Sequence, residues 1–152
     1  MLFLQASVDG GQAKVFEEAI KEYGVFITTY PQSRSGDTAF FLAGVLNLMI
    51  ENDWVDHDFI DKYTVGFEQV AEYCKQWTPA KTAEVSGIPE RSIRQAAEWW
   101  GTAKSSFLFH ARGIEHHSNG VQNALGTINL CLASGRLGKP KSGYGTIVGQ
   151  AN

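Results

Sequence analysis

The residues best suited to contact a ligand lie between Gly113 and Gly120, where a predicted strand meets a predicted helix. Free backbone amides at the start of a helix, together with small polar side chains, favour binding of a phosphate or another anion. The same segment is equally typical of an ordinary helix start, with Ser118 or Asn119 as the N-cap. The residues alone therefore do not distinguish an anion site from a capped helix start.

Glu115, His116 and His117 also belong to residue types that bind metals. Adjacent residues of a strand point to opposite faces, so the three cannot all reach one ion from that conformation. His57 and His110 lie elsewhere, at no recognisable ligand spacing. We therefore predict no metal site, and we expect the histidines to be hydrogen-bond donors or satisfied core residues.

Other polar groups lie outside this segment. Arg112 follows the predicted strand, and its guanidinium is suited to bind an anion or to pair with a carboxylate. Asp37 either caps the helix predicted over Thr38–Asn52 or accepts hydrogen bonds from a ligand, and the pattern alone favours the cap. The C-terminal segments 143–146 and 149–152 supply glycine backbone and amide groups, which suit a large polar ligand.

No nucleophile arrangement of the Ser/His/Asp or Cys/His kind, no GxGxxG fingerprint and no P-loop occurs in the sequence. Cys74 and Cys131 lie far apart, so we expect two buried free thiols and no ligation of iron–sulfur or molybdenum by this chain. The tryptophans stand at predicted helical positions and are expected to be packing residues: Trp54, Trp77, Trp99 and Trp100.

The overall composition is that of a globular protein. The chain has 152 residues, of which 43% are hydrophobic and 19% charged. A net charge of -3 argues against a nucleic-acid partner, which would require a Lys/Arg face. No apolar run approaches the roughly 20 residues that cross a bilayer, and the first residues lack the basic start of a signal peptide. We therefore expect a soluble, cytoplasmic chain without a membrane span.

The elements that would position these residues follow an α/β pattern. A strand over Leu2–Ala6, a helix over Ala13–Tyr23 and a strand over residues 25–29 predict a βαβ unit, and hence a parallel sheet. Ligands of such sheets lie beyond the carboxyl ends of the strands, which are here Ser7–Gly11 and Tyr30–Asp37.

We expect a single α/β domain over residues 1–152, with a Rossmann-like parallel sheet, flanking helices and a helical insertion at about residues 53–103. The further elements expected are helices over Thr38–Asn52, Val55–Tyr63 and Phe67–Trp77, a helix from Thr78-Pro79 to Ser86-Gly87, a helix from Pro89 to Trp100 with Gly101 as its stop, a strand over Ser106–Ala111, a helix over about Asn119–Ser134, and an irregular end from Gly135 to Asn152.

The stretch Phe107–Gly120, FLFHARGIEHHSNG, resembles a segment of the bis-molybdopterin guanine dinucleotide oxidoreductases, the dimethyl sulfoxide reductase superfamily. The likeness covers residues 35–152 well and residues 1–34 loosely. The Ala-Arg-Gly-Ile-Glu and Gly-Tyr-Gly-Thr pieces are most similar to assimilatory nitrate reductases, although formate dehydrogenases share much of this region. Other stretches in the family's order are Gly36–Phe40, Asp58–Ile60, Gly66–Glu68, Thr78-Pro79, Ile128–Leu130, Ser134–Pro140 and Gly149–Asn152.

The resemblance implies an α/β domain that cradles one of two pterin dinucleotides. Asp37 matches an aspartate near the guanosine end of the cofactor. Arg112 precedes the loop that lines the pterin–diphosphate part, and the matching loop residues are Gly113, His116, His117, Ser118 and Asn119. The element close to the pterin is matched by Gly149, Gln150 and Asn152. His116 stands where relatives usually carry Gln, and Ala151 interrupts the family's Gly-Gln-Asn-Asn element.

In function, the resemblance implies a segment of a molybdenum oxidoreductase that reduces nitrate by two-electron oxygen-atom transfer, with a formate dehydrogenase-like enzyme as the alternative within the family. The isolated segment is expected to be inactive, with any iron–sulfur cluster in other parts of the parent. The implied partners are the remaining domains of the parent and an electron-donor protein or domain, and self-association is expected in isolation.

Two alternative hypotheses assign the chain to other kinds of protein. The chain could be a stand-alone, degenerate nucleotide- or pterin-binding or assembly module without activity. A nicotinamide-dependent Rossmann enzyme is disfavoured because the glycine fingerprint is missing.

Overall fold

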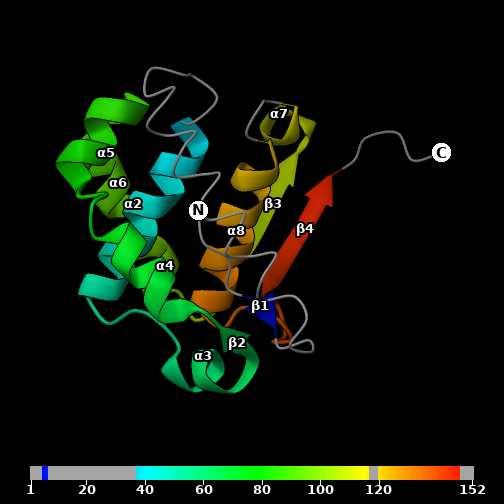
Figure 1. Cartoon of the computed structure of the whole chain (residues 1–152). Helices are drawn as coiled ribbons and strands as arrows, with labels where there is room; N and C mark the ends of the chain where they lie inside the picture. Colours follow the sequence, from blue (N-terminus) through cyan, green and yellow to red (C-terminus); the bar gives the residue numbers. More distant parts are fainter. Residues whose placement is uncertain (1–4, 7–36, 117–119, 148–152) are drawn as a thin grey trace.

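The computed structural model describes residues 5–6, 37–116 and 120–147 (Figure 1). Its elements in chain order are β1 (Gln5–Ala6), α2 (Asp37–Glu51), α3 (His57–Tyr63), β2 (Thr64–Val65), α4 (Phe67–Cys74), α5 (Pro79–Ser86), α6 (Glu90–Thr102), β3 (Phe107–Ala111), α7 (Arg112–Glu115), α8 (Gly120–Ala133) and β4 (Gly143–Ile147). None of the helices in these described ranges is both long and apolar enough to cross a membrane.

Helix α2 is the centre of the fold. It contacts α4, α5, α6 and α8, which surround it in Figure 1. A helix that is apolar on all sides must be buried on all sides, and Leu46 and Met49 are almost completely inaccessible. Gly44 allows α5 to approach closely, because a Cβ at this position would lie 2.3 Å from Thr82 Oγ1. The predicted deep burial of this helix is confirmed.

The ends of α5 follow the local signals in the sequence. The Thr78 hydroxyl accepts a hydrogen bond from the Lys81 amide at 3.3 Å, and Pro79 occupies the first turn, where its missing N–H is not needed. Gly87 ends the helix in the left-handed conformation, with φ of 73°. The predicted helix from Thr78-Pro79 to Ser86-Gly87 is therefore confirmed.

Three predictions in the helical region are wrong in detail. Helix α6 continues through Gly101 to Thr102, so this glycine is not a stop. It is small because Trp54 packs against it: a Cβ would lie 2.7 Å from the Trp54 Cβ. Helix α4 ends at Cys74 and does not reach Trp77. Trp99 is 67% exposed and is not a packing residue, whereas Trp77 is buried in the core.

Strands β3 and β4 form a parallel pair in which Phe107 lies opposite Gly143 and Ala111 opposite Ile147. The strand predicted over Ser106–Ala111 is confirmed, but the irregular end predicted from Gly135 is wrong for β4. Glycine is a poor strand residue, and here the aromatic ring of Phe107 covers the glycines of β4. A Cβ on Gly143 would lie 3.0 Å from that ring. The tertiary contact thus explains a strand that local propensity does not predict.

Strand β1 does not belong to this parallel sheet. It pairs antiparallel with β2, with Gln5 opposite Val65 and Ala6 opposite Thr64. Thr64 leaves α3 in an extended conformation, in which it can pair with β1. The rest of the βαβ unit predicted over residues 2–29 lies outside the described residues. The α/β class is confirmed by the helices and the small parallel sheet, whereas a larger Rossmann-like sheet stays a prediction.

The two faces of the β3–β4 sheet differ. Helix α8 covers the face that carries Leu108 and the buried His110. The opposite face carries Phe107, Phe109 and Ile147, and Phe109 is 61% exposed. Parallel sheets are normally covered on both faces. We therefore expect the predicted self-association of the isolated chain to involve this apolar face.

Candidate functional site

The carboxyl ends of β3 and β4 lie at the same edge of the sheet. The strands are parallel, and their last residues, Ala111 and Ile147, are register partners. Arg112 comes directly after β3, and residues 148–152 come directly after β4. The predicted ligand segment 112–119 therefore begins at the edge where ligands of parallel sheets bind. Strand β4 ends at the same edge, and the predicted segment 149–152 follows it in the sequence.

Two long helices begin at this end of the molecule. In Figure 1 the start of α2, at Asp37, and the start of α8, at Gly120, lie at the same end of the described structure as α7. The N-terminal end of a helix carries a partial positive charge that favours anions. This placement agrees with an anionic ligand at the edge.

The structure describes only some of the predicted site residues. Asp37 is the first residue of α2, one position earlier than the predicted helix start, and Arg112 and Gly113 lie in α7. His116 is the C-cap of α7. The remaining predicted residues lie outside the described residues: His117, Ser118, Asn119, Gly149, Gln150 and Asn152.

The turn after β3 is helical, which the sequence did not predict. Glu115 lies inside α7 and His116 directly follows it, so the extended conformation assumed for these residues is wrong. The turn packs tightly on α8, because a Cβ on Gly120 would lie 1.7 Å from the Glu115 carbonyl oxygen. The Asn123 side-chain amide also donates to the Ile114 carbonyl at 3.1 Å. Helix α8 therefore packs directly against α7.

Gly113 lies on the open side of the same turn. A Cβ built on it would meet none of the described residues within 4 Å, in contrast to Gly120. Its backbone is thus accessible to a bulky group approaching the edge.

A chain of polar side chains connects the sheet to α7. His110 of β3 is buried, and its Nε2 is hydrogen-bonded to the Tyr144 hydroxyl of β4. Its Nδ1 lies 3.4 Å from Oε1 of Glu115, and the other carboxylate oxygen lies 3.5 Å from the Arg112 guanidinium. Burial raises the pKa of Tyr144, and the negative charge of Glu115 contributes to the increase. The sequence marked Arg112 as a possible partner of a carboxylate, but it did not identify His110, Glu115 and Tyr144 as one group.

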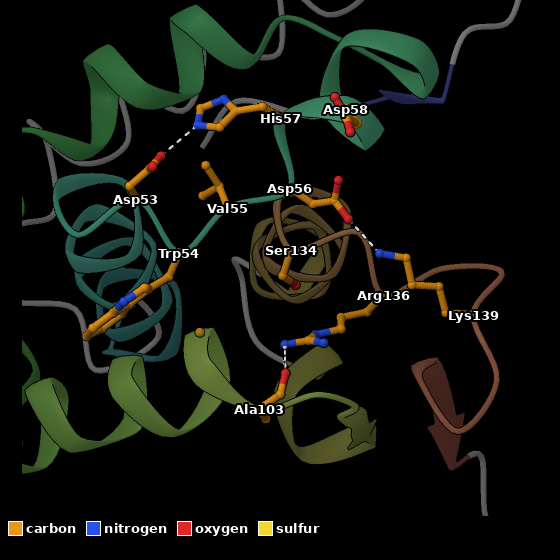
Figure 2. A pocket seen from close by; sticks show the side chains of 11 residues that line it. Asp53, Trp54, Val55, Asp56, His57, Asp58, Ala103, Ser134, Arg136 and Lys139 are labelled. Atoms are coloured by element: carbon orange, nitrogen blue, oxygen red, sulfur yellow. Dashed lines mark hydrogen bonds and ion pairs between the residues drawn. The ribbon is translucent and has the colours of Figure 1, made fainter.

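A second candidate is an open pocket of about 520 Å³ at the other end of the fold, between the α2–α3 turn and the loop after α8 (Figure 2). Figure 2 shows Lys139 reaching Asp56, at 2.5 Å, and Arg136 reaching the Ala103 carbonyl, at 2.6 Å. Arg136 also donates to the carbonyls of Trp100 and Lys104. The cations that line this pocket are therefore occupied in holding the fold together.

The two cysteines do not form a redox site. Both are free and buried, as predicted. Burial raises the pKa of each thiol to about 12, so both remain protonated and unreactive near neutral pH.

No protein-family profile matches the chain, but individual proteins do. The chain is 34% identical over 119 residues to the assimilatory nitrate reductase catalytic subunit of Bacillus subtilis, covering 78% of this chain and 17% of that protein. It is 32% identical over 108 residues to the F420-dependent formate dehydrogenase 2 subunit alpha of Methanococcus maripaludis, covering 71% and 16%. It is also 32% identical over 117 residues to the nitrate reductase of Synechocystis sp., covering 77% and 16%.

These relatives confirm the resemblance found in the sequence: the chain belongs to the molybdopterin oxidoreductase family. It spans about a sixth of the length of each of the three relatives, at 16–17%. Nitrate reductases and a formate dehydrogenase match at similar identity, so the similarity defines the family and not the substrate.

Proposed function

We propose that this chain forms one wall of the binding site for molybdopterin guanine dinucleotide in a larger molybdenum oxidoreductase. The observation that carries the proposal is the shared edge at which β3 and β4 end, since Ala111 and Ile147 are register partners and the two predicted ligand segments follow these strands in the sequence. The cofactor supplies two-electron redox chemistry at molybdenum, and this chain binds and orients it.

The described groups at the edge fit a diphosphate. The Arg112 side chain is 56% exposed, so its guanidinium is accessible to an anion. The open space beside Gly113 admits a bulky group to the backbone, and the starts of α2 and α8 favour negative charge. In the proposal Asp37 contacts the guanosine end and His116 the diphosphate part. The other residues proposed to bind the cofactor lie outside the described residues: His117, Ser118, Asn119, Gly149, Gln150 and Asn152.

We propose nitrate as the substrate of the whole enzyme, which would be reduced to nitrite with two electrons and two protons. The 34% identity to the nitrate reductase of Bacillus subtilis over 78% of this chain supports the choice. Formate oxidation has equal support from the 32% identity to the formate dehydrogenase of Methanococcus maripaludis. We further propose that the enzyme is cytoplasmic. Residues 1–152 would form a single domain with residues 53–103 as a helical insertion. This domain would contact the remaining domains of the parent enzyme and an electron-donor protein or domain. Any iron–sulfur cluster would lie in those remaining parts.

The test uses the full polypeptide that carries this sequence. Molybdenum and released guanosine are measured per polypeptide, and nitrate reduction and formate oxidation are assayed with redox dyes. We expect one or more molybdenum atoms with guanosine, and nitrate reduction. A full-length protein without molybdenum would refute the cofactor proposal, whereas formate oxidation alone would refute only the choice of nitrate.

A variant pair localises the binding to the edge. Arg112→Ala is expected to lower the cofactor content or its retention on dialysis, because it removes an accessible cation. Arg94→Ala is the matched control: Arg94 is 58% exposed and pairs with Glu90 on α6, just as Arg112 is 56% exposed and pairs with Glu115 on α7. Equal cofactor retention in both variants would place the diphosphate away from this edge.

A further inference from the structure

We propose that Glu115 is a placeholder for the ligand's anionic group: it pairs with Arg112 when the ligand is absent and moves to His110 when the ligand binds. This inference rests on the proposed function, because it requires an anion at the edge. It assigns positioning roles to His110, which is buried, and to Tyr144, which is partly buried; both lie outside the predicted site.

The first argument is the position of the Glu115 carboxylate. One oxygen lies 3.4 Å from His110 Nδ1, and the other lies 3.5 Å from an Arg112 nitrogen. Charge-assisted hydrogen bonds between such groups are typically about 2.7–2.9 Å long. Both contacts are therefore longer than a good bond. In the proposed exchange, the carboxylate moves toward one partner, which shortens that contact, and away from the other.

The second argument is the state of His110. Its side chain is only 1% exposed, and its Nδ1 makes no hydrogen bond in the described part of the chain. Leaving a buried polar group without a partner is unfavourable, so a nearby acceptor gains by approaching it. The nearest carboxylate is that of Glu115, and water has little access to the ring.

Tyr144 makes His110 a suitable donor. If the Tyr144 hydroxyl donates to Nε2, the remaining imidazole proton is on Nδ1, where it faces Glu115. The opposite arrangement would direct an Nδ1 lone pair at a carboxylate, which is repulsive. The Glu115 carboxylate beside Nδ1 thus favours the tautomer in which Nδ1 carries the proton and Tyr144 donates to Nε2.

The exchange follows from these contacts. In the absence of ligand, Glu115 partly neutralises Arg112 at the edge. A phosphate group offers Arg112 more acceptor oxygens than one distant carboxylate oxygen and displaces it. The released carboxylate then accepts a hydrogen bond from His110 Nδ1, so that neither the buried imidazole nor the carboxylate is left unpaired.

The exchange predicts that substitutions of two neighbouring residues, Glu115 and His110, change the anion affinity in opposite directions. Glu115→Gln removes the negative competitor of the ligand, so anion binding becomes tighter. His110→Phe removes the alternative partner, so Glu115 stays on Arg112 and binding becomes weaker. Because a partly exposed ion pair contributes up to about 1 kcal/mol, each effect should be about two- to five-fold. If Glu115 and His110 only supported the fold, both substitutions would weaken anion binding.

The experiment uses the full polypeptide produced in a host that cannot make molybdopterin, with GDP as the probe. Dissociation constants are measured by calorimetry for the wild type, E115Q, H110F and H110Q. His110→Gln keeps a side-chain N–H donor and is expected to restore affinity close to the wild type. Glu90→Gln, which removes the partner of Arg94 on α6, is the matched control and should leave GDP binding unchanged. Thermal unfolding of each variant verifies that it is folded.

Tighter binding in E115Q with weaker binding in H110F supports the exchange. Changes of the same sign in both variants, or none in either, overturn it. If the wild type purified with its cofactor contains molybdenum and guanosine but the variants fail this pattern, only the exchange is wrong. If the wild type neither binds GDP nor contains molybdenum, the proposed function itself fails.

Discussion

Substituting Gly120 by alanine tests how α7 is positioned. The added Cβ would lie 1.7 Å from the Glu115 carbonyl oxygen and 2.5 Å from its carbonyl carbon. Carbon–oxygen contacts are normally about 3.3 Å or longer, so α7 and α8 would have to separate by roughly 1.6 Å. The obstacle is backbone, which cannot rotate away as a side chain does. Overpacking of this kind costs about 1–3 kcal/mol.

The control is the same chemical change at Gly113, seven positions earlier in the chain. Within the described part of the chain, a Cβ there meets nothing within 4 Å, and the residue lies in a helical turn. Alanine is a better helix former than glycine by up to about 1 kcal/mol, so Gly113→Ala should be neutral or stabilising. If the cofactor approaches the Gly113 backbone as proposed, the new methyl group will still reduce cofactor content.

The assay combines hydrogen exchange of peptides from α7 and α8 with the molybdenum content of the full polypeptide. A destabilisation of 1–3 kcal/mol corresponds to exchange that is about 5- to 150-fold faster in Gly120→Ala. We expect faster exchange and lost cofactor in Gly120→Ala, and unchanged exchange with reduced cofactor in Gly113→Ala. Wild-type exchange in Gly120→Ala, or equal destabilisation in both variants, would refute the described packing of α7 on α8.

Three further predictions concern the scaffold. Cys74 and Cys131 should not react with a thiol reagent at pH 8 in the native protein, because burial raises the pKa of each thiol to about 12. Both should react after denaturation, and rapid labelling of either thiol in the native protein would contradict its burial. The hydrogen bond from Lys139 lowers the pKa of Asp56 below 3.8, so this pair stabilises the folded state fully above about pH 4 and progressively less as the pH falls through the pKa of the folded state. The free energy of unfolding should therefore depend less on acid pH in Asp56→Asn, and an unchanged pH profile would count against the pairing. Arg136→Met should destabilise the fold by roughly 2–4 kcal/mol in denaturant unfolding, because the partly buried carbonyls of Trp100 and Ala103 lose the donor that the buried Arg136 supplies. A change below about 0.5 kcal/mol would show that these hydrogen bonds contribute little.

Features encoded by neighbouring residues were predictable. The start and end of α5 follow from Thr78, Pro79 and Gly87, because a cap and a left-handed glycine act within one helical turn. The burial of α2 follows from its apolar residues on all sides. The family also followed from the sequence, since several short stretches in a fixed order carry it without reference to their contacts.

Features that depend on distant residues were not predictable in the same way. Gly101 looked like a helix stop, but its role is to make room for Trp54, which local pattern does not reveal. Strand β4 looked irregular because its glycines are poor strand residues, and only the Phe107 ring from a strand far away in the sequence explains its extended form.

The candidate site illustrates the same division. The sequence by itself determined the family, the residue types at the edge and most helices, because these depend on local order along the chain. Only the tertiary structure decided that the strands preceding the two ligand segments end at one edge, since that depends on the parallel register of β3 and β4. It also decided that Glu115 lies between Arg112 and a buried histidine, because that contact requires the helical turn that α8 imposes on α7.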